Sequence, residues 1–357
     1  MRLVWYIDTR HGGGDISSAL KIPEILVTKV SVIVPNYNKG PYLDKRLSSI
    51  LSQTYSDFEL LFLDDASTDD SLEVFRRYSS DPRVRAIFNE SNTGNVFKQW
   101  NKGFAEAKGE YIWIAEADDY ADIHFLEILV GGLENHPNAG LACCRPMAVD
   151  AQDHLLGPVD CYHHWRQRNG KDVVEDYFNS GRDECANYMV IHNTIQNASG
   201  VVFRRSALEK AGYADERYRL AGDWLFWVNI LLVGDMVFFA DTLNYWRTDQ
   251  HTVRSSSEKN GLAIAESYNV VRRIIDVVDV DPDTLEESCA FWWYRWSTAN
   301  KKHHFSIACN LEIYRAAKQV DKRINARILW HRFGRIRPAL GRIKAFLLKI
   351  RRNLRFS

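Results

Sequence analysis

Two adjacent carboxylates, Asp118 and Asp119, follow the apolar run from Tyr111 to Ala115. At the end of a buried strand they would repel one another and lose hydration, and a divalent cation would relieve both costs. Carboxylate oxygens suit Mg²⁺ or Mn²⁺, which can neutralise the charge that develops on a diphosphate leaving group. The structural alternative is a helix N-terminus, where acidic residues act as caps. The pair alone leaves both interpretations open.

Two further polar clusters occupy similar positions. The segment PNYN at 35–38 and the segment DDASTD at 64–69 each come at the end of an apolar run. A carboxylate in such a place can accept hydrogen bonds from a nucleobase. The Ser, Thr and Asp of the second segment are also good caps for a following helix, so a structural role stays open there as well.

The elements that must position these clusters can be read from hydrophobic periodicity. Apolar runs at 30–35, 58–63, 84–88 and 111–115 predict strands, and amphipathic segments at 42–51, 71–78, 96–107 and 125–133 predict helices. This alternation predicts an α/β fold with a mostly parallel sheet and helices on both faces. Ligands of such sheets bind beyond the carboxyl ends of the strands, so we expect the three polar clusters to form one crevice.

The chain resembles the family 2 inverting glycosyltransferases of the GT-A fold. Two segments carry the resemblance: VSVIVPNYNKGPYLDKRLSSILSQTYSDFELLFLDDASTDDS and NTGNVFKQWNKGFAEAKGEYIWIAEADDYAD. VPNYN, DDASTDDS and EADD in this order are specific together, although each alone is weak. The resemblance is strong over 30–149 and weaker to about 256. It implies a GT-A type sheet followed by a C-terminal helical region.

The resemblance also implies roles for individual residues on the nucleotide side. Pro35 and Tyr37 would line the base pocket, with Tyr37 stacking on the base, and Asp65 would hydrogen-bond the base. Asp118 would lie on the ribose side, and Asp119 would be the metal ligand. Lys98 lies in a segment that approaches the diphosphate, and the alternative for it is a solvated helix face.

Further roles fall in the second half of the chain. Asp223, in the segment AGDW, matches the catalytic base of the family, which takes the proton of the acceptor hydroxyl as that oxygen attacks the sugar. The alternative for Asp223 is a helix cap. Trp224 would form the floor of the sugar or acceptor site. Arg247 would pair with a phosphate. His251 would complete the shell of Mn²⁺ or Mg²⁺ or contact the diphosphate, with a structural histidine as its alternative.

These roles predict an inverting transferase that moves a sugar from a nucleotide-diphosphate donor, expected to be a UDP-sugar, to a hydroxyl of a glycan or lipid-linked acceptor. Polysaccharide assembly is the expected setting. A sugar nucleotidyltransferase would need a glycine-rich basic loop after the first strand, which 35–39 does not supply. A non-catalytic nucleotide-sugar-binding partner is expected to lack an acid at one of the key positions, yet Asp65, Asp119 and Asp223 are all present.

Charge is unevenly distributed along the chain. Residues 322–357 contain 12 Lys or Arg and no acid, which leaves the rest of the chain with a net charge of about −12. The tail 329–357 spaces its apolar residues by three and four, which favours an in-plane helix on an anionic membrane. A coiled coil or a helix packed on its own domain are the alternatives. No nucleic-acid recognition module accompanies the charge.

The remaining features concern compartment and domain limits. Six cysteines without a C-x-x-C pair favour a reducing compartment over a metal or disulfide framework. No apolar run approaches the length of a membrane-spanning helix, so we expect a cytoplasmic enzyme held peripherally at the inner face of the plasma membrane. The expected domains are an extension at 1–29, a catalytic domain at 30–255 divided into 30–149 and 150–255, a helical region at 256–328 and the basic tail.

Overall fold

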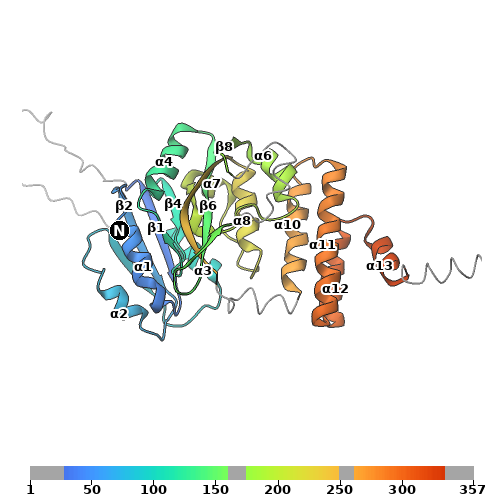
Figure 1. Cartoon of the computed structure of the whole chain (residues 1–357), viewed down its shortest axis with the longest axis horizontal. Helices are drawn as coiled ribbons and strands as arrows, with labels where there is room; N and C mark the ends of the chain where they lie inside the picture. The colour runs from blue at the N-terminus through green and yellow to red at the C-terminus, as the bar shows by residue number, and fades with distance from the viewer. Residues whose placement is uncertain (1–27, 160–173, 249–260, 334–357) are drawn as a thin grey trace, which may run out of the picture.

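The computed structural model describes residues 28–159, 174–248 and 261–333 (Figure 1). The predicted ligand His251, most of the N-terminal extension and most of the basic tail lie outside these residues. No helix within the described ranges is both long enough and apolar enough to cross a membrane.

One sheet organises the molecule. Its strand order is β3-β2-β1-β4-β9-β6-β10-β5, with β7 paired to β6 and β8 to β10. Six of the ten strands in the described chain run in one direction, which confirms the expected mostly parallel α/β sheet. The strands are β1 (Val30–Asn36), β2 (Phe58–Asp64), β3 (Val84–Phe88), β4 (Tyr111–Ile114), β5 (Tyr120–Ala121), β6 (Ala139–Val149), β7 (Leu155–Pro158), β8 (Tyr177–Asn179), β9 (Val201–Arg204) and β10 (Asp235–Arg247).

Helices cover both faces of the sheet, as the alternating strand residues require. Val32 of β1 belongs to one core with α1 (Gly40–Leu51), α2 (Ser71–Arg76) and α4 (Phe125–Asn135). Its neighbour Ile33 belongs to a second core. That core includes α3 (Val96–Glu106), α7 (Arg205–Ala211) and α8 (Gly222–Leu231). Every β1 residue is buried, because both of its faces are covered.

The C-terminal helices form a further layer beyond α8 (Figure 1). They are α10 (Leu262–Ile275), α11 (Pro282–His303), α12 (Ile307–Lys318) and α13 (Ile324–Phe333). Ile264 and Tyr268 of α10 are buried in the same core as α3 and α8. Packing therefore joins the expected helical region to the sheet through a continuous apolar interior.

The polar segment 150–190 has little hydrophobic periodicity, from which we expect loops, yet its described residues contain regular structure. It holds β7, β8, the short helix α6 (Gly181–Glu184) and one π-helical turn, Cys185–Met189. β8 runs antiparallel to β10, with Phe178 opposite Val237. The expectation failed here because such short strands are defined by their distant partner and carry little periodicity of their own.

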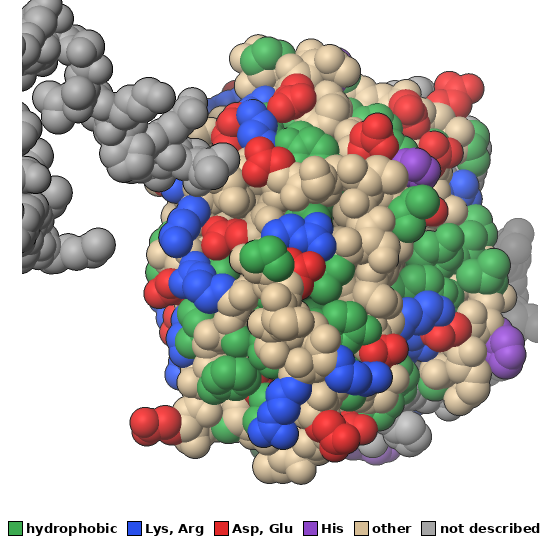
Figure 2. All heavy atoms as spheres, turned by 90° about the vertical axis from the view of Figure 1, so that its left-hand side faces the viewer, with side chains coloured by type: hydrophobic (Ala, Val, Ile, Leu, Met, Phe, Trp, Pro, Cys, Tyr) green, Lys and Arg blue, Asp and Glu red, His purple; other side chains and the backbone are tan. Residues whose placement is uncertain are grey.

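Surface charge on the described part is mixed on one face. Figure 2 looks onto the side where α1 and α2 lie in Figure 1, and acidic and basic side chains are interspersed there. Much of the predicted basic excess belongs to the tail, outside the described residues.

Two glycines provide a matched test of packing. A Cβ built on Gly109 would lie 2.5 Å from the backbone nitrogen of Ser31, whereas one on Gly131 of α4 would meet no atom within 4 Å. We expect Gly109→Ala to destabilise the protein by about 1–3 kcal/mol, because backbone must move. Gly131→Ala should stabilise it by about 0.4–1 kcal/mol. Denaturant unfolding measures both, and equal effects would contradict this packing.

Candidate functional site

The carboxyl ends of β1, β2 and β4 lie at one edge of the sheet. Asn36 at the end of β1 pairs in register with Asp64 at the end of β2, and Asn36 Nδ2 donates to Ser67 Oγ at 3.0 Å. Lys39 Nζ, just beyond β1, lies 2.6 Å from Asp118 Oδ2, beyond β4. The structure therefore brings the three polar clusters side by side.

Asp65 holds together the loop that follows β3. Its buried carboxylate accepts hydrogen bonds from Asn89 Nδ2 at 2.6 Å, Gln99 Nε2 at 2.8 Å and Thr93 Oγ1 at 2.9 Å. The backbone N–H of Thr93 also donates to it, at 3.0 Å. This geometry gives Asp65 a strong internal role. Its predicted contact with a base stays a prediction.

The other residues predicted on the nucleotide side differ in exposure. Pro35 is buried within β1, whereas Tyr37, just after β1, is 46% exposed. Lys98 is exposed on the first turn of α3, whose N-cap is the side chain of Asn95. Tyr37 is thus available for stacking, and Lys98 fits either a diphosphate contact or a solvated helix face.

The two acids of the pair face different surroundings. The side chain of Asp118 is 29% exposed and pairs with Lys39. Asp119 is 2% exposed, and its carboxylate accepts from the backbone N–H of Arg247 at 2.9 Å and from Asn197 Nδ2 at 2.9 Å. Burial, followed by the charge of Asp118, raises the pKa of Asp119. Asp118, rather than Asp119, therefore presents carboxylate oxygen to solvent.

The described residues supply only part of a metal shell. Within them, no group of three or more His, Cys, Asp or Glu side chains could hold a metal ion. The oxygen of Asp118 is a hard ligand of the kind that Mg²⁺ and Mn²⁺ accept. A cation at this edge would need further oxygens, and a bound diphosphate carries such oxygens.

Arg46 is a site residue that the sequence analysis missed. It is fully buried on α1 and donates from Nε to the backbone oxygen of Glu116 at 2.8 Å. Its two terminal nitrogens have no acceptor among the described residues. Burial lowers the pKa of Arg46 to about 10, against the charges of Asp119, Asp118 and Glu116. A charged residue within the apolar stripe of α1 was the available sequence signal.

Glu116 was also missed. Its carboxylate accepts from Trp100 Nε1 at 2.9 Å, and its own N–H donates to Ser199 Oγ at 3.1 Å. Burial raises the pKa of Glu116 to about 8, and the charges of Asp118 and Asp119 act in the same direction. Glu116, Asp118 and Asp119 thus lie together in the loop after β4, which we call the acidic loop.

Arg247 lies in the interior, which does not fit the predicted phosphate contact. Only 5% of the residue is exposed. Its guanidinium donates to the backbone oxygens of Asp118 at 2.9 Å and Asp150 at 2.6 Å, and it pairs with the carboxylate of Asp153. The same group lies 4.3 Å from the centroid of the Tyr42 ring. These contacts assign Arg247 to holding the acidic loop in place.

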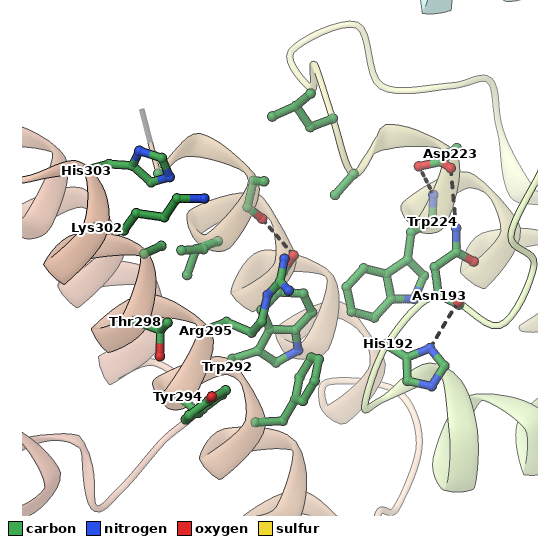
Figure 3. A pocket seen from close by; sticks show the side chains of 18 of the residues that line it. His192, Asn193, Asp223, Trp224, Trp292, Tyr294, Arg295, Thr298, Lys302 and His303 are labelled. Atoms are coloured by element: carbon green, nitrogen blue, oxygen red, sulfur yellow. Dashed lines mark hydrogen bonds between the residues drawn. The ribbon is translucent and has the colours of Figure 1, made fainter. Parts of the chain in front are cut away.

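Asp223 and Trp224 begin α8 and line a cavity of about 390 Å³ (Figure 3). Asn193 Nδ2 donates to Asp223 at 3.3 Å, and the backbone N–H of Trp224 donates to it at 2.7 Å. Trp224 is 3% exposed as a residue, and its ring stacks on that of Trp292 of α11, with centroids 5.7 Å apart. The cavity wall contains Asp223 but not Asp65, Asp118 or Asp119.

One short segment nevertheless connects the two regions. Asn197 bonds Asp119, and Asn193 bonds Asp223. Cα atoms four residues apart lie within about 14 Å of each other. The acidic pair and Asp223 are therefore neighbours on opposite ends of the same segment, with the cavity on the side of Asp223.

The family model described as glycosyl transferase family 2 matches residues 31–212. Glycosyltransferase GlyG of Streptococcus pneumoniae is 42% identical over 172 residues, which are 48% of this chain and 50% of GlyG. Poly(ribitol-phosphate) beta-N-acetylglucosaminyltransferase TarS of Staphylococcus aureus is 26% identical over 294 residues, 80% of this chain and 47% of TarS. The chain thus spans about half the length of these two curated relatives.

Solved structures show the same fold. The crystal structure of TarS 1–349 from S. aureus in complex with UDP-GlcNAc has a TM-score of 0.63 at 19% identity, covering 84% of this chain and 83% of that one. A mannosyltransferase from Pyrobaculum calidifontis in complex with GDP-Man and Mn²⁺ has a TM-score of 0.53 at 17% identity, covering 84% and 75%. The expected GT-A architecture is confirmed.

A substitution of Arg46 tests whether its charge stabilises the acids of the loop after β4. We expect Arg46→Met to lower the free energy of unfolding by about 3–5 kcal/mol, because it leaves buried acids without their cation. Denaturant unfolding at pH 8 measures this change. Arg76→Met, at an exposed position on α2, is the matched control and should stay within about 0.5 kcal/mol of the parent. An Arg46 variant as stable as the control would contradict the view that the Arg46 charge stabilises the buried acids.

Proposed function

Because the chain belongs to glycosyl transferase family 2, we propose that it is an inverting enzyme that transfers a sugar from a UDP-sugar to a hydroxyl group of a glycan or lipid-linked acceptor. The observation that carries this proposal is the arrangement of acids: the Asp118 and Asp119 pair and Asp223 lie at the two ends of the segment from Asn193 to Asn197.

The donor would bind at the carboxyl ends of β1, β2 and β4. The ring of the half-exposed Tyr37 offers a flat face for the base, and Asp65 fixes the loop beside it. A structure of TarS holds UDP-GlcNAc on the same fold, which supports a uridine nucleotide as donor. Lys98, exposed on α3, is proposed to meet the diphosphate.

A divalent cation, Mn²⁺ or Mg²⁺, would neutralise the diphosphate as it leaves. We assign its protein ligand to Asp118, because that carboxylate reaches solvent while Asp119 is used inside the protein. The Mn²⁺ in the complex of the mannosyltransferase supports a metal for this fold. Asp119 and Arg247 would then position the backbone that carries Asp118. His251 remains a proposed further ligand.

Asp223 would act as the general base. Its carboxylate lines the cavity and is oriented by Asn193, so an acceptor hydroxyl placed there can lose its proton to it. The acceptor oxygen then attacks the anomeric carbon as the bond to the diphosphate breaks. One displacement without an enzyme nucleophile inverts the configuration at that carbon.

Attachment to a membrane is a separate proposal that rests on the sequence of the tail alone. Basic and apolar residues alternate through 329–357, as in helices that lie in the plane of an anionic bilayer.

The base assignment is tested by Asp223→Asn. We expect transfer to fall by about 10²–10⁴-fold, because the amide cannot accept the proton. Binding of UDP-sugar, measured by calorimetry with Mn²⁺, should stay unchanged. Asp241→Asn, an exposed acid on β10, is the control and should keep full transfer. Near-normal transfer by the Asp223 variant at saturating donor would remove this assignment.

The metal assignment is tested by comparing two alanine variants. Asp118→Ala should abolish the Mn²⁺ dependence of UDP binding and leave thermal stability near that of the parent, because its carboxylate is partly exposed. Asp119→Ala should lower the melting temperature, because it leaves Asn197 and the Arg247 N–H without an acceptor. If UDP binding by the Asp118 variant still responds to Mn²⁺, another residue holds the cation.

A further inference from the structure

The cavity beside Asp223 has a basic wall supplied by α11. Arg295, Thr298 and Lys302 all line it, and their spacing of three and four residues places them on one helix face (Figure 3). Arg295 and Lys302 are seven residues apart, or about 10 Å along the helix axis. The neighbouring Lys301 does not line the cavity.

The charge of the whole lining has one dominant sign. Arg295 and Lys302 contribute two basic side chains to it. Asp223 is the one carboxylate among the lining residues that the structure describes. A cavity next to a proposed base is therefore set to attract a negatively charged molecule.

Aromatic side chains of α11 and α8 also line the cavity. Trp224 of α8 stacks on Trp292 of α11 at 30°, and Phe291 and Tyr294 of α11 line the cavity as well. Trp224 Nε1 is buried and has no acceptor among the described residues. Flat apolar faces with an unused N–H donor suit the C–H faces and hydroxyls of a sugar or polyol.

We propose that this cavity is the acceptor site, and that Arg295 and Lys302 of α11 select an acceptor that carries a phosphate or carboxylate group beside the hydroxyl that reaches Asp223. This inference rests on the proposed function, from which it takes the sugar transfer and the role of Asp223 as the base. It goes beyond that function in assigning acceptor choice to the C-terminal helices. An acceptor with either group would be an anionic polyol or sugar.

Binding is tested on the full chain with four probes. Sorbitol 6-phosphate and sorbitol form one pair, and glucuronate and glucose form the other, so the two pairs separate phosphate from carboxylate recognition. Saturation-transfer NMR at low salt measures binding without any donor. We expect at least one anionic probe to bind about tenfold more tightly than its neutral partner, and to lose this advantage as salt rises.

Variants then locate the effect. The double variant Arg295→Gln with Lys302→Gln should lose the preference for the anionic probe. Lys301 is exposed and does not line the cavity, so Lys301→Gln should keep that preference. Equal binding of charged and neutral probes, no binding of any probe, or equal behaviour of the two variants would overturn the inference. UDP-sugar binding is measured in parallel. If the parent chain does not bind UDP-sugar, the proposed function is refuted. If it binds UDP-sugar but does not distinguish the charged from the neutral probes, only the acceptor assignment is refuted.

Discussion

The concentration of acids at the end of β4 is the constraint on which the site depends. Glu116, Asp118 and Asp119 would repel one another if nothing compensated them. Arg46 lies beneath them with its charge buried, and Lys39 meets Asp118 from the end of β1. The acids are thus compensated by two cations of one helix, Arg46 within α1 and Lys39 at its N-cap.

The same loop is tied to distant parts of the chain. Arg247, at the end of β10, donates to the backbone of Asp118 and, through its own N–H, to Asp119. Ser199 accepts from Glu116 N–H at 3.1 Å and from Trp113 Nε1 at 2.8 Å. These bonds fix where the acids point, so the geometry of the proposed donor side depends on β10 and on the turn Ala198–Gly200 before β9 as much as on β4.

The segment between Asn193 and Asn197 links the donor side to the cavity. Since it bonds an acid at each end, a shift of this segment would change the positions of Asp119 and Asp223 together. The C-terminal helices complete the far wall, with Trp292 of α11 stacked on Trp224. The helical layer is thus part of the proposed reaction site as well as of the core.

The sequence by itself determined the alternating elements, the mostly parallel sheet, the family resemblance and the order of the polar clusters. These follow from local periodicity and from the rule that parallel strands end at one edge. Tertiary structure alone decided that Asp118 faces solvent while Asp119 is buried, that Arg247 serves the interior, and that Arg46 lies beneath the acids. The directions of adjacent side chains in a loop are set by partners more than a hundred residues away, as for Asp119 and Arg247, and local sequence patterns carry no record of such pairing.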